Sequence, residues 1–172
     1  MDLLNRTVAA LKSGRQPELT QSGGHGPEVD LRIPALLPDD YVPDVHGRLI
    51  QYKRLASAVD VDELRELEVE MIDRFGLLPD AAKNLIAVTD LKLRAAPLGI
   101  KKIDASAGGG RILFGPDPKI DAQALVALVQ QEADRFKLNG AQTLAFYWDM
   151  ASARQRIEAV NGLLARLTPA AL

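Results

Sequence analysis

The spacing of apolar residues changes near Gly99, and this change limits the fold more than any other feature of the sequence. Before that point apolar residues recur at helical spacing, most clearly in residues 61–75, whose core-facing stripe is Leu64, Leu67, Met71 and Phe75. After it, GIKKIDA and RILFG predict a β-hairpin around a flexible SAGGG, and TLAFYWD predicts a further strand. Helices grouped early, followed by an antiparallel sheet with helices, predict the α+β class: a small, mainly antiparallel sheet packed with several helices.

Turn and capping residues set the boundaries of the expected elements. EVDLRIP alternates like a half-buried strand that ends at Pro34, and Asp44 is placed to cap the next helix. Asp60 and Glu63 have capping-box spacing before the helical stripe, and Gly76 stands where a helix end favours a left-handed residue. We also expect helices from about Pro79 to Pro97, from Asp121 to about Asn139, and from about Ala151 to Leu167.

The chain is predicted to hold one compact domain preceded by a short helix and a linker. Its 172 residues suffice to bury roughly 70% of the surface that the unfolded chain would expose. Residues 1–14 predict an amphipathic helix without a capping signal of its own, and the polar, Gly- and Pro-rich residues 15–27 predict a flexible linker. The folded domain is therefore expected to cover residues 28–172.

The composition excludes several classes of function. The absence of cysteine excludes disulfides and thiolate chemistry and fits a reducing cytoplasm, which is the location we expect. No run of about 18 apolar residues exists, so no membrane partner is expected. The net charge of −2 argues against a dedicated nucleic-acid surface. Residues 28–80 nevertheless hold thirteen acidic against six basic side chains, which fits either a partner surface or ordinary solvated helix faces.

No motif predicts catalysis, a cofactor or a metal. GGGR, which ends at Arg111, lacks the Lys-Ser/Thr pair of a phosphate loop and precedes a strand rather than a helix. His25 and His46 have no second histidine at ligand spacing, so a zinc site is not expected. Turn and cap roles explain the early acidic residues better than a cation site does: Asp39, Asp40 and Asp44. We expect that this chain is not an enzyme and has no catalytic, cofactor or metal residues.

The helix predicted over residues 61–75 carries a charged sector beside its apolar stripe. On a helical wheel with about 100° per residue, the sector contains Glu63, Glu66, Glu70, Asp73 and Arg74. Four carboxylates around one arginine exceed what the helix needs for its own stability, because i, i+4 pairs contribute little. From the residues alone, this sector is either a solvated acidic face or a docking surface for a basic patch.

A long stretch of the sequence resembles the C-terminal domain of the bacterial transcription-repair coupling factor family (Mfd). The residues that carry the resemblance are EVDLRIPALLPDDYVPDVHGRLIQYKRLASA and ELEVEMIDRFGLLPD. The resemblance continues through LGIKKIDA and the hairpin, and it covers about residues 28–167. The leading MDLLNRTVAALKSGR is similar to the segment that leaves the translocase motor in the same family, which would make residues 1–14 the tail of a preceding module.

The resemblance implies that the chain is a regulatory domain of a larger protein. In this family the whole factor is an ATP-driven DNA translocase that releases stalled RNA polymerase and recruits the excision-repair protein UvrA, and its ATP and Mg sites would lie outside this chain. The C-terminal domain is expected to fold back on an N-terminal UvrB-like module and mask the UvrA-binding surface, without catalysis of its own. The interdomain docking residues that match by motif are Glu70, Asp73 and Arg74, with Glu63 and Glu66 as accessory contacts.

Two other functions remain open. The first is an accessory DNA-binding module beside the motor, which would use the basic residues Lys101, Lys102 and Arg111 around the hairpin. The second is a structural cap that holds the last helix of the motor and regulates nothing.

Overall fold

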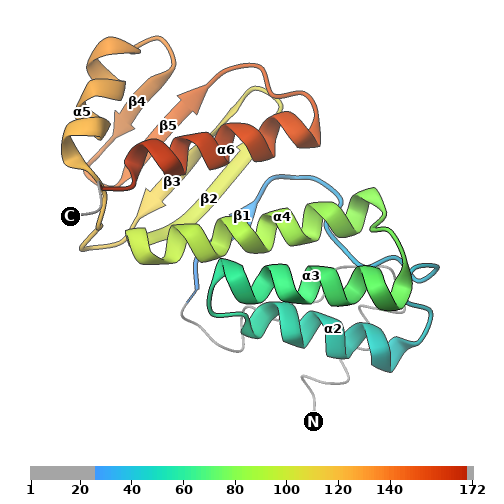
Figure 1. Ribbon diagram of the computed structural model, residues 1–172. Helices are drawn as coiled ribbons and strands as arrows, with labels where there is room; N and C mark the ends of the chain where they lie inside the picture. The colour runs from blue at the N-terminus through green and yellow to red at the C-terminus, as the bar shows by residue number, and fades with distance from the viewer. Residues whose placement is uncertain (1–25, 170–172) are drawn as a thin grey trace, which may run out of the picture. The chain divides into compact units, whose positions relative to one another are not determined.

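The computed structural model describes residues 26–169, which group into two compact units (Figure 1). Of the described residues, the first unit contains 34–90, and the second contains 26–33 and 91–169. The helix predicted for residues 1–14 and most of the linker predicted for 15–27 lie outside the described residues. The predicted domain boundaries therefore stay predictions.

The first unit is helical. It contains α2 (Val45–Ser57), α3 (Val61–Phe75) and most of α4 (Asp80–Ala95), and Figure 1 shows α2 and α3 side by side. Asp44 caps α2 by accepting a hydrogen bond from the Gly47 amide at 3.0 Å, and Asp60 caps α3 by accepting one from the Glu63 amide at 2.8 Å. Both caps confirm the sequence prediction. The second half of the predicted capping box differs, because the Glu63 side chain accepts from the Val59 amide, at 3.2 Å.

The apolar stripe of α3 is buried along most of its length. Leu64, Leu67 and Met71 are buried, as the helical spacing predicts. The prediction that Phe75 belongs to the core is wrong, because its ring is only half-buried at the last residue of the helix. There the ring packs edge-on against Tyr41, with 5.8 Å between the ring centroids.

Gly76 ends α3 and turns the chain. Its amide donates to the Ile72 carbonyl at 2.9 Å, and its φ of 93° has the positive sign that the sequence predicts. Its ψ of −173° nevertheless places it outside the left-handed helical region, so the expected left-handed cap is corrected to an extended turn. Leu77, which follows, is exposed, whereas Leu78 is buried.

The second unit contains a five-stranded sheet. Its strands are β1 (Glu28–Asp30), β2 (Ile100–Ser106), β3 (Gly109–Phe114), β4 (Phe136–Asn139) and β5 (Thr143–Tyr147), in the spatial order β1-β2-β3-β5-β4. β1 pairs in parallel with β2, and the other neighbouring pairs are antiparallel. Together with the helices, this sheet confirms the predicted α+β class.

β1 is shorter than EVDLRIP predicts. Arg32 has a φ of 53°, which ends the extended conformation after Asp30. The segment after β1 is held instead by Arg156, whose guanidinium donates to the Leu31 carbonyl at 3.0 Å and to the Met150 carbonyl at 2.9 Å. A three-residue strand thus keeps its place through side-chain hydrogen bonds as well as through the ladder.

Only part of SAGGG forms the turn of the predicted hairpin: Ala107 and Gly108 are turn residues, whereas the last two glycines belong to a strand, which corrects the predicted extent of the flexible tip. Gly109 and Gly110 lie in β3 between β2 and β5. A Cβ atom on Gly110 would lie 2.7 Å from Cζ of Phe146 and would collide with the Asp104 carbonyl oxygen. Close packing of three strands and an aromatic ring therefore requires glycine at this position.

The helices of the second unit begin where the sequence predicts. α5 (Ala122–Gln131) is capped by Asp121, and α6 (Ala153–Leu167) is capped by Ser152 in a capping box with Gln155. The prediction that the helix after Asp121 continues to Asn139 is wrong, because residues 136–139 form the edge strand β4. A short 3₁₀ helix, η2 (Ala96–Leu98), precedes β2.

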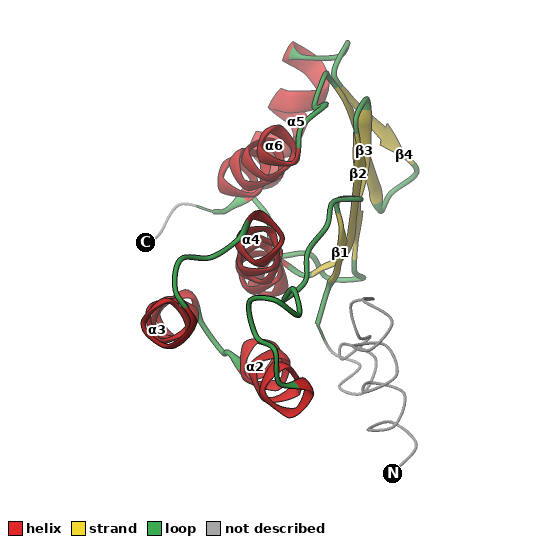
Figure 2. Cartoon of the chain, turned by 90° about the vertical axis from the view of Figure 1, so that its right-hand side faces the viewer, coloured by secondary structure: helices red, strands yellow, loops and turns green. Residues whose placement is uncertain are grey.

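The core of the second unit lies between the sheet and α6. Figure 2 shows α6 along one face of the sheet. The side chains buried there come from β2, β3, β5 and α6: Ile103, Ile112, Leu144, Phe146, Val160, Leu163, Leu164 and Leu167. Ile103, Ile112 and Leu144 are directly opposite one another in the strand register, which places them on the same face.

Candidate docking surface

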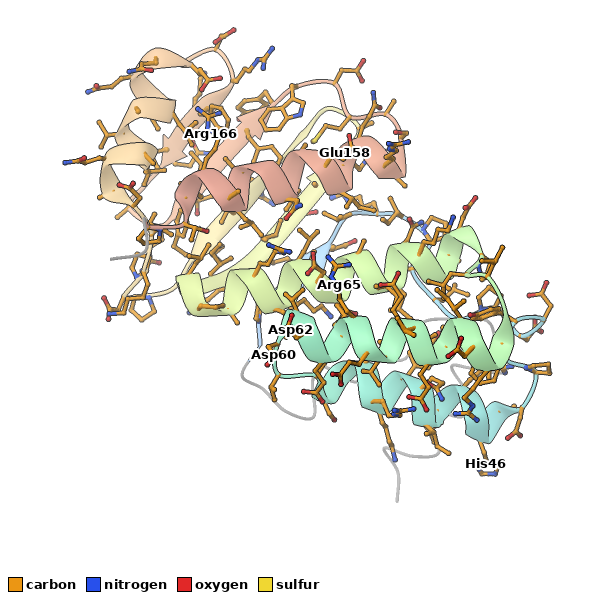
Figure 3. All side chains as sticks on the ribbon, in the orientation of Figure 1. His46, Asp60, Asp62, Arg65, Glu158 and Arg166 are labelled. Atoms are coloured by element: carbon orange, nitrogen blue, oxygen red, sulfur yellow. The ribbon has the colours of Figure 1, made fainter. Side chains whose placement is uncertain are left out.

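The charged sector predicted on α3 faces solvent. Glu66, Asp73 and Arg74 are exposed and Glu63 and Glu70 are half-buried, whereas the apolar stripe of the same helix is buried. This arrangement follows from the sequence, because helical periodicity separates the two sets of side chains. Asp60, Asp62 and Arg65 mark the first turns of the same helix in Figure 3.

Glu70 is paired with cations of its own unit. Arg54, on α2, donates from Nη2 to Glu70 Oε2, and Nη1 of Arg74 lies 4.0 Å from Glu70 Oε1. The hydrogen bond from Arg54 lowers the pKa of the Glu70 carboxyl below its ordinary value. The same hydrogen bond raises the pKa of Arg54. Glu70 is thus held in its charged form and oriented between two guanidinium groups.

Arg54 is the residue that the sequence analysis missed. It lies on α2, sixteen positions before Glu70, and its relation to Glu70 depends on how α2 packs against α3. No local spacing rule connects residues on two different helices. One sequence signal was available. In LIQYKRLA, Arg54 lies next to Leu55, which is buried, and this position indicates that Arg54 is near a helix interface.

Glu66 and Asp73 differ from Glu70 in having no internal partner. Both side chains are exposed, and in the part of the chain that the structure describes neither forms an ion pair or a hydrogen bond through its carboxylate. Unpaired carboxylates on one face of a helix attract cations from outside the unit. Glu63, by contrast, already accepts a hydrogen bond from the chain before α3.

Arg74 is presented on an aromatic surface. Its guanidinium carbon lies 4.9 Å from the centroid of the Phe75 ring, which is cation–π distance. The rest of the group remains exposed, so its planar fork is accessible to a carboxylate of a partner. The three residues predicted from the motif therefore lie together at the C-terminal half of α3, with Glu70 and Arg74 in direct electrostatic contact.

A solvent-open groove of about 410 Å³ lies between α2 and α3. It is lined by Lys53, Arg54, Ser57, Glu63, Glu66, Leu67 and Glu70. Charges of both signs line the groove and only one of its residues is apolar, unlike the largely apolar pockets that bind small molecules. The groove can instead receive charged side chains of another protein surface.

The other residues considered in the sequence analysis, those of the basic patch and His46, do not form a second site in the described residues. Nζ of Lys102 lies 3.9 Å from Glu28, and Nη2 of Arg111 lies 3.8 Å from Asp104, so two of the three cations in the basic patch are paired with acids. His46 is exposed at the start of α2 (Figure 3). Among residues 26–169, no group of three or more His, Cys, Asp or Glu side chains is arranged to hold a metal ion.

Comparison with known proteins identifies the family. A family model described as the TRCF domain matches residues 31–125. The chain belongs to the TRCF domain family. The matched range includes α2, α3 and α4, and with them every residue of the predicted docking surface.

Relatives of this TRCF domain are transcription-repair-coupling factors. The factor of Escherichia coli is 42% identical over 97% of this chain, and that of Haemophilus influenzae is 44% identical over 95%. The chain spans 14% of the length of each of these two relatives. The resemblance read from the sequence is confirmed.

A solved structure shares the fold of this TRCF domain. It is described as the crystal structure of the C-terminal domain of transcription-repair coupling factor. The match has a TM-score of 0.69 at 22% identity and covers 83% of this chain and 96% of that chain. The TRCF domain described here thus has the fold of that C-terminal domain. In the described part of the chain, no helix has the length and apolar character needed to cross a bilayer.

Proposed function

We propose that this TRCF domain is a non-catalytic, autoinhibitory domain of its parent factor. The parent is an ATP-dependent DNA translocase that releases stalled RNA polymerase and recruits nucleotide excision repair. In the resting parent, the outer face of α3 docks on the N-terminal UvrB-like module and covers the surface that binds UvrA. The family membership supports the parent's role, and the charged face of α3 supports the docking.

The observation that carries the proposal is the unpaired state of Asp73 and Glu66. The charge of Glu70 is already compensated within the unit by Arg54. Asp73 and Glu66 have no ion-pair partner in the described residues, and they flank Glu70 along the same helix. A basic patch on the UvrB-like module supplies the missing countercharges and fixes the register of docking.

The reduction in apparent UvrA affinity depends on the fraction of molecules in which the domain is open. A ligand that binds only the open state has its apparent affinity reduced by the open fraction. If roughly 1% of molecules are open, release of the domain tightens apparent UvrA binding about a hundredfold, or by about 2.7 kcal/mol. Replacement of Asp73 by lysine opens the domain further than alanine does, because it places like charges opposite one another.

The experiment compares UvrA affinity for the intact parent, for Asp73→Lys and for a parent that lacks residues 28–172. We expect the deletion to bind about a hundredfold more tightly than the intact parent and Asp73→Lys to recover much of this gain. The matched control is Glu158→Lys on α6 (Figure 3), which reverses another exposed helix carboxylate and leaves UvrA affinity unchanged. Equal UvrA affinities for the intact, variant and truncated parents would exclude autoinhibition and favour the structural-cap function.

A further inference from the structure

Leu77 projects into solvent directly after the docking helix. Its side chain is 86% exposed, the highest value among the large apolar side chains of residues 26–169. Val69, on the outer face of α3, is 60% exposed. Single exposed apolar side chains are common on protein surfaces, but Leu77 is held on a fixed turn and has charged neighbours in the sequence.

The backbone that carries Leu77 is fixed on both sides. Before it, the Gly76 carbonyl accepts a hydrogen bond from the Tyr41 hydroxyl at 2.8 Å. After it, Leu78 is buried, and Pro79 accepts a hydrogen bond from the Lys83 amide at 2.9 Å in the first turn of α4. A leucine on a rigid turn loses little conformational entropy when a partner covers it, whereas a leucine on a mobile loop would lose more.

Charged residues lie close in the sequence to the two apolar residues. Asp73 follows Val69 by one helical turn and precedes Leu77 by four residues, and Arg74 stands beside it on the last turn of α3. We call these four residues the anchor patch: Val69, Asp73, Arg74 and Leu77. Apolar contacts in the centre of a protein interface are commonly surrounded by charged residues of this kind, and rigid apolar anchors carry a large share of binding energy.

We propose that Leu77 and Val69 are the apolar anchors of the docking surface. Their occupant is a folded module with an apolar depression bordered by a lysine or arginine, because Asp73 forms no ion pair among residues 26–169 and its charge is complemented by a cation across the interface. This inference rests on the proposed function and adds the chemistry of the contact. The chain spans 14% of the length of its relatives, so the parent holds other modules that can present such a depression.

Thiol labelling of Leu77→Cys measures the contact directly, because the chain contains no cysteine of its own. The labelling rate is determined by mass spectrometry on the peptide that contains residue 77, in the intact parent and in the 172-residue chain alone. We expect labelling to be at least tenfold slower in the parent. The matched control is Val59→Cys, at a side chain that is 77% exposed before the other end of α3, and its rate should be equal in the two proteins.

The outcomes separate the contact from the autoinhibition. Equal labelling rates for Leu77→Cys in both proteins, together with tighter UvrA binding by Asp73→Lys, would leave the proposed function standing and overturn the anchors. Slow labelling in the parent, with UvrA affinity unchanged by Asp73→Lys, would support the anchors and overturn the autoinhibition. Leu77→Ser provides the energetic measurement: we expect the parent variant to bind UvrA about tenfold more tightly, with no change for Val59→Ser.

Discussion

Met71 and Phe75 occupy successive turns of the same apolar stripe, yet their environments differ. Met71 is 1% exposed, whereas the Phe75 ring is half-buried against Tyr41. Met71→Ala should therefore cost about 2–5 kcal/mol of unfolding free energy, as large-to-small changes in a packed core do. Phe75→Ala should cost less than Met71→Ala, because water already reaches part of the ring. Urea melts of the two variants test this order, and equal losses would contradict it.

Glu70 gives the stability of the domain a specific dependence on pH. Its pKa is lowered by Arg54, so the carboxylate stabilises the folded state fully above the pKa of the unfolded chain. This contribution is lost as the pH falls through the lower folded-state pKa. The stability difference between the wild type and Glu70→Gln should therefore be present at pH 7 and shrink as the pH falls below about 4.

Glu66→Gln is the matched control for this titration. Glu66 lies one turn away on the same helix, and it forms no ion pair in the described residues. Denaturant melts at several pH values should therefore show no comparable pH-dependent difference for Glu66→Gln. A pH-independent deficit in Glu70→Gln would mean that the Arg54 contact does not bias the protonation of Glu70.

At the scale of single elements, the β2–β3 hairpin depends on one glycine. An alanine at Gly110 would push its Cβ against Phe146 and the Asp104 carbonyl, so Gly110→Ala should cost about 1–3 kcal/mol or more. Gly108→Ala is the matched control, because a Cβ there meets no atom within 4 Å. Thermal melts should show a lower midpoint for Gly110→Ala alone. Equal midpoints would mean that the strands rearrange at no cost.

The elements that the sequence predicts well are those with several agreeing local signals. α3 has an apolar stripe, an Asp60 cap and a terminal Gly76, and its bounds match the prediction. β4 was missed because it is a four-residue strand in which only Phe136 is buried, so its alternation is too short to oppose the helical pattern before it. β1 was predicted too long because the positive φ of Arg32 has no sequence signature.

In the candidate site, too, features set by local sequence patterns could be predicted and features set by contacts between elements could not. Helical periodicity was enough to place Glu66, Asp73 and Arg74 on an exposed face. The pairing of Glu70 with Arg54 and the hydrogen bond from Tyr41 to the Gly76 carbonyl depend on contacts between elements. Such contacts involve residues far apart in the sequence, and periodicity and capping rules do not predict them.

At the scale of the whole chain, the net charge and the ion pairs of the basic patch argue against a DNA-binding function. The net charge is −2, and Lys102 and Arg111 of the basic patch are close to Glu28 and Asp104. Titration of a labelled DNA duplex at low salt, followed by fluorescence anisotropy, should therefore show no micromolar binding. Micromolar affinity that falls steeply with added salt would support the accessory DNA-binding module.

The parallel pairing of β1 with β2 also has a consequence for co-translational folding. Val29 pairs with Ile103, so β1 is synthesised roughly seventy residues before its partner strand, and the helices α2 and α3 lie between them. Closing so long a loop costs about 2 kcal/mol more than closing one of about ten residues. Pulse-labelled hydrogen exchange during refolding should show the β1 amides protected after those of the β2–β3 hairpin, and simultaneous protection would contradict this order. Because β1 emerges first but pairs late, the nascent chain can complete its helical unit while this edge of the future sheet is still open.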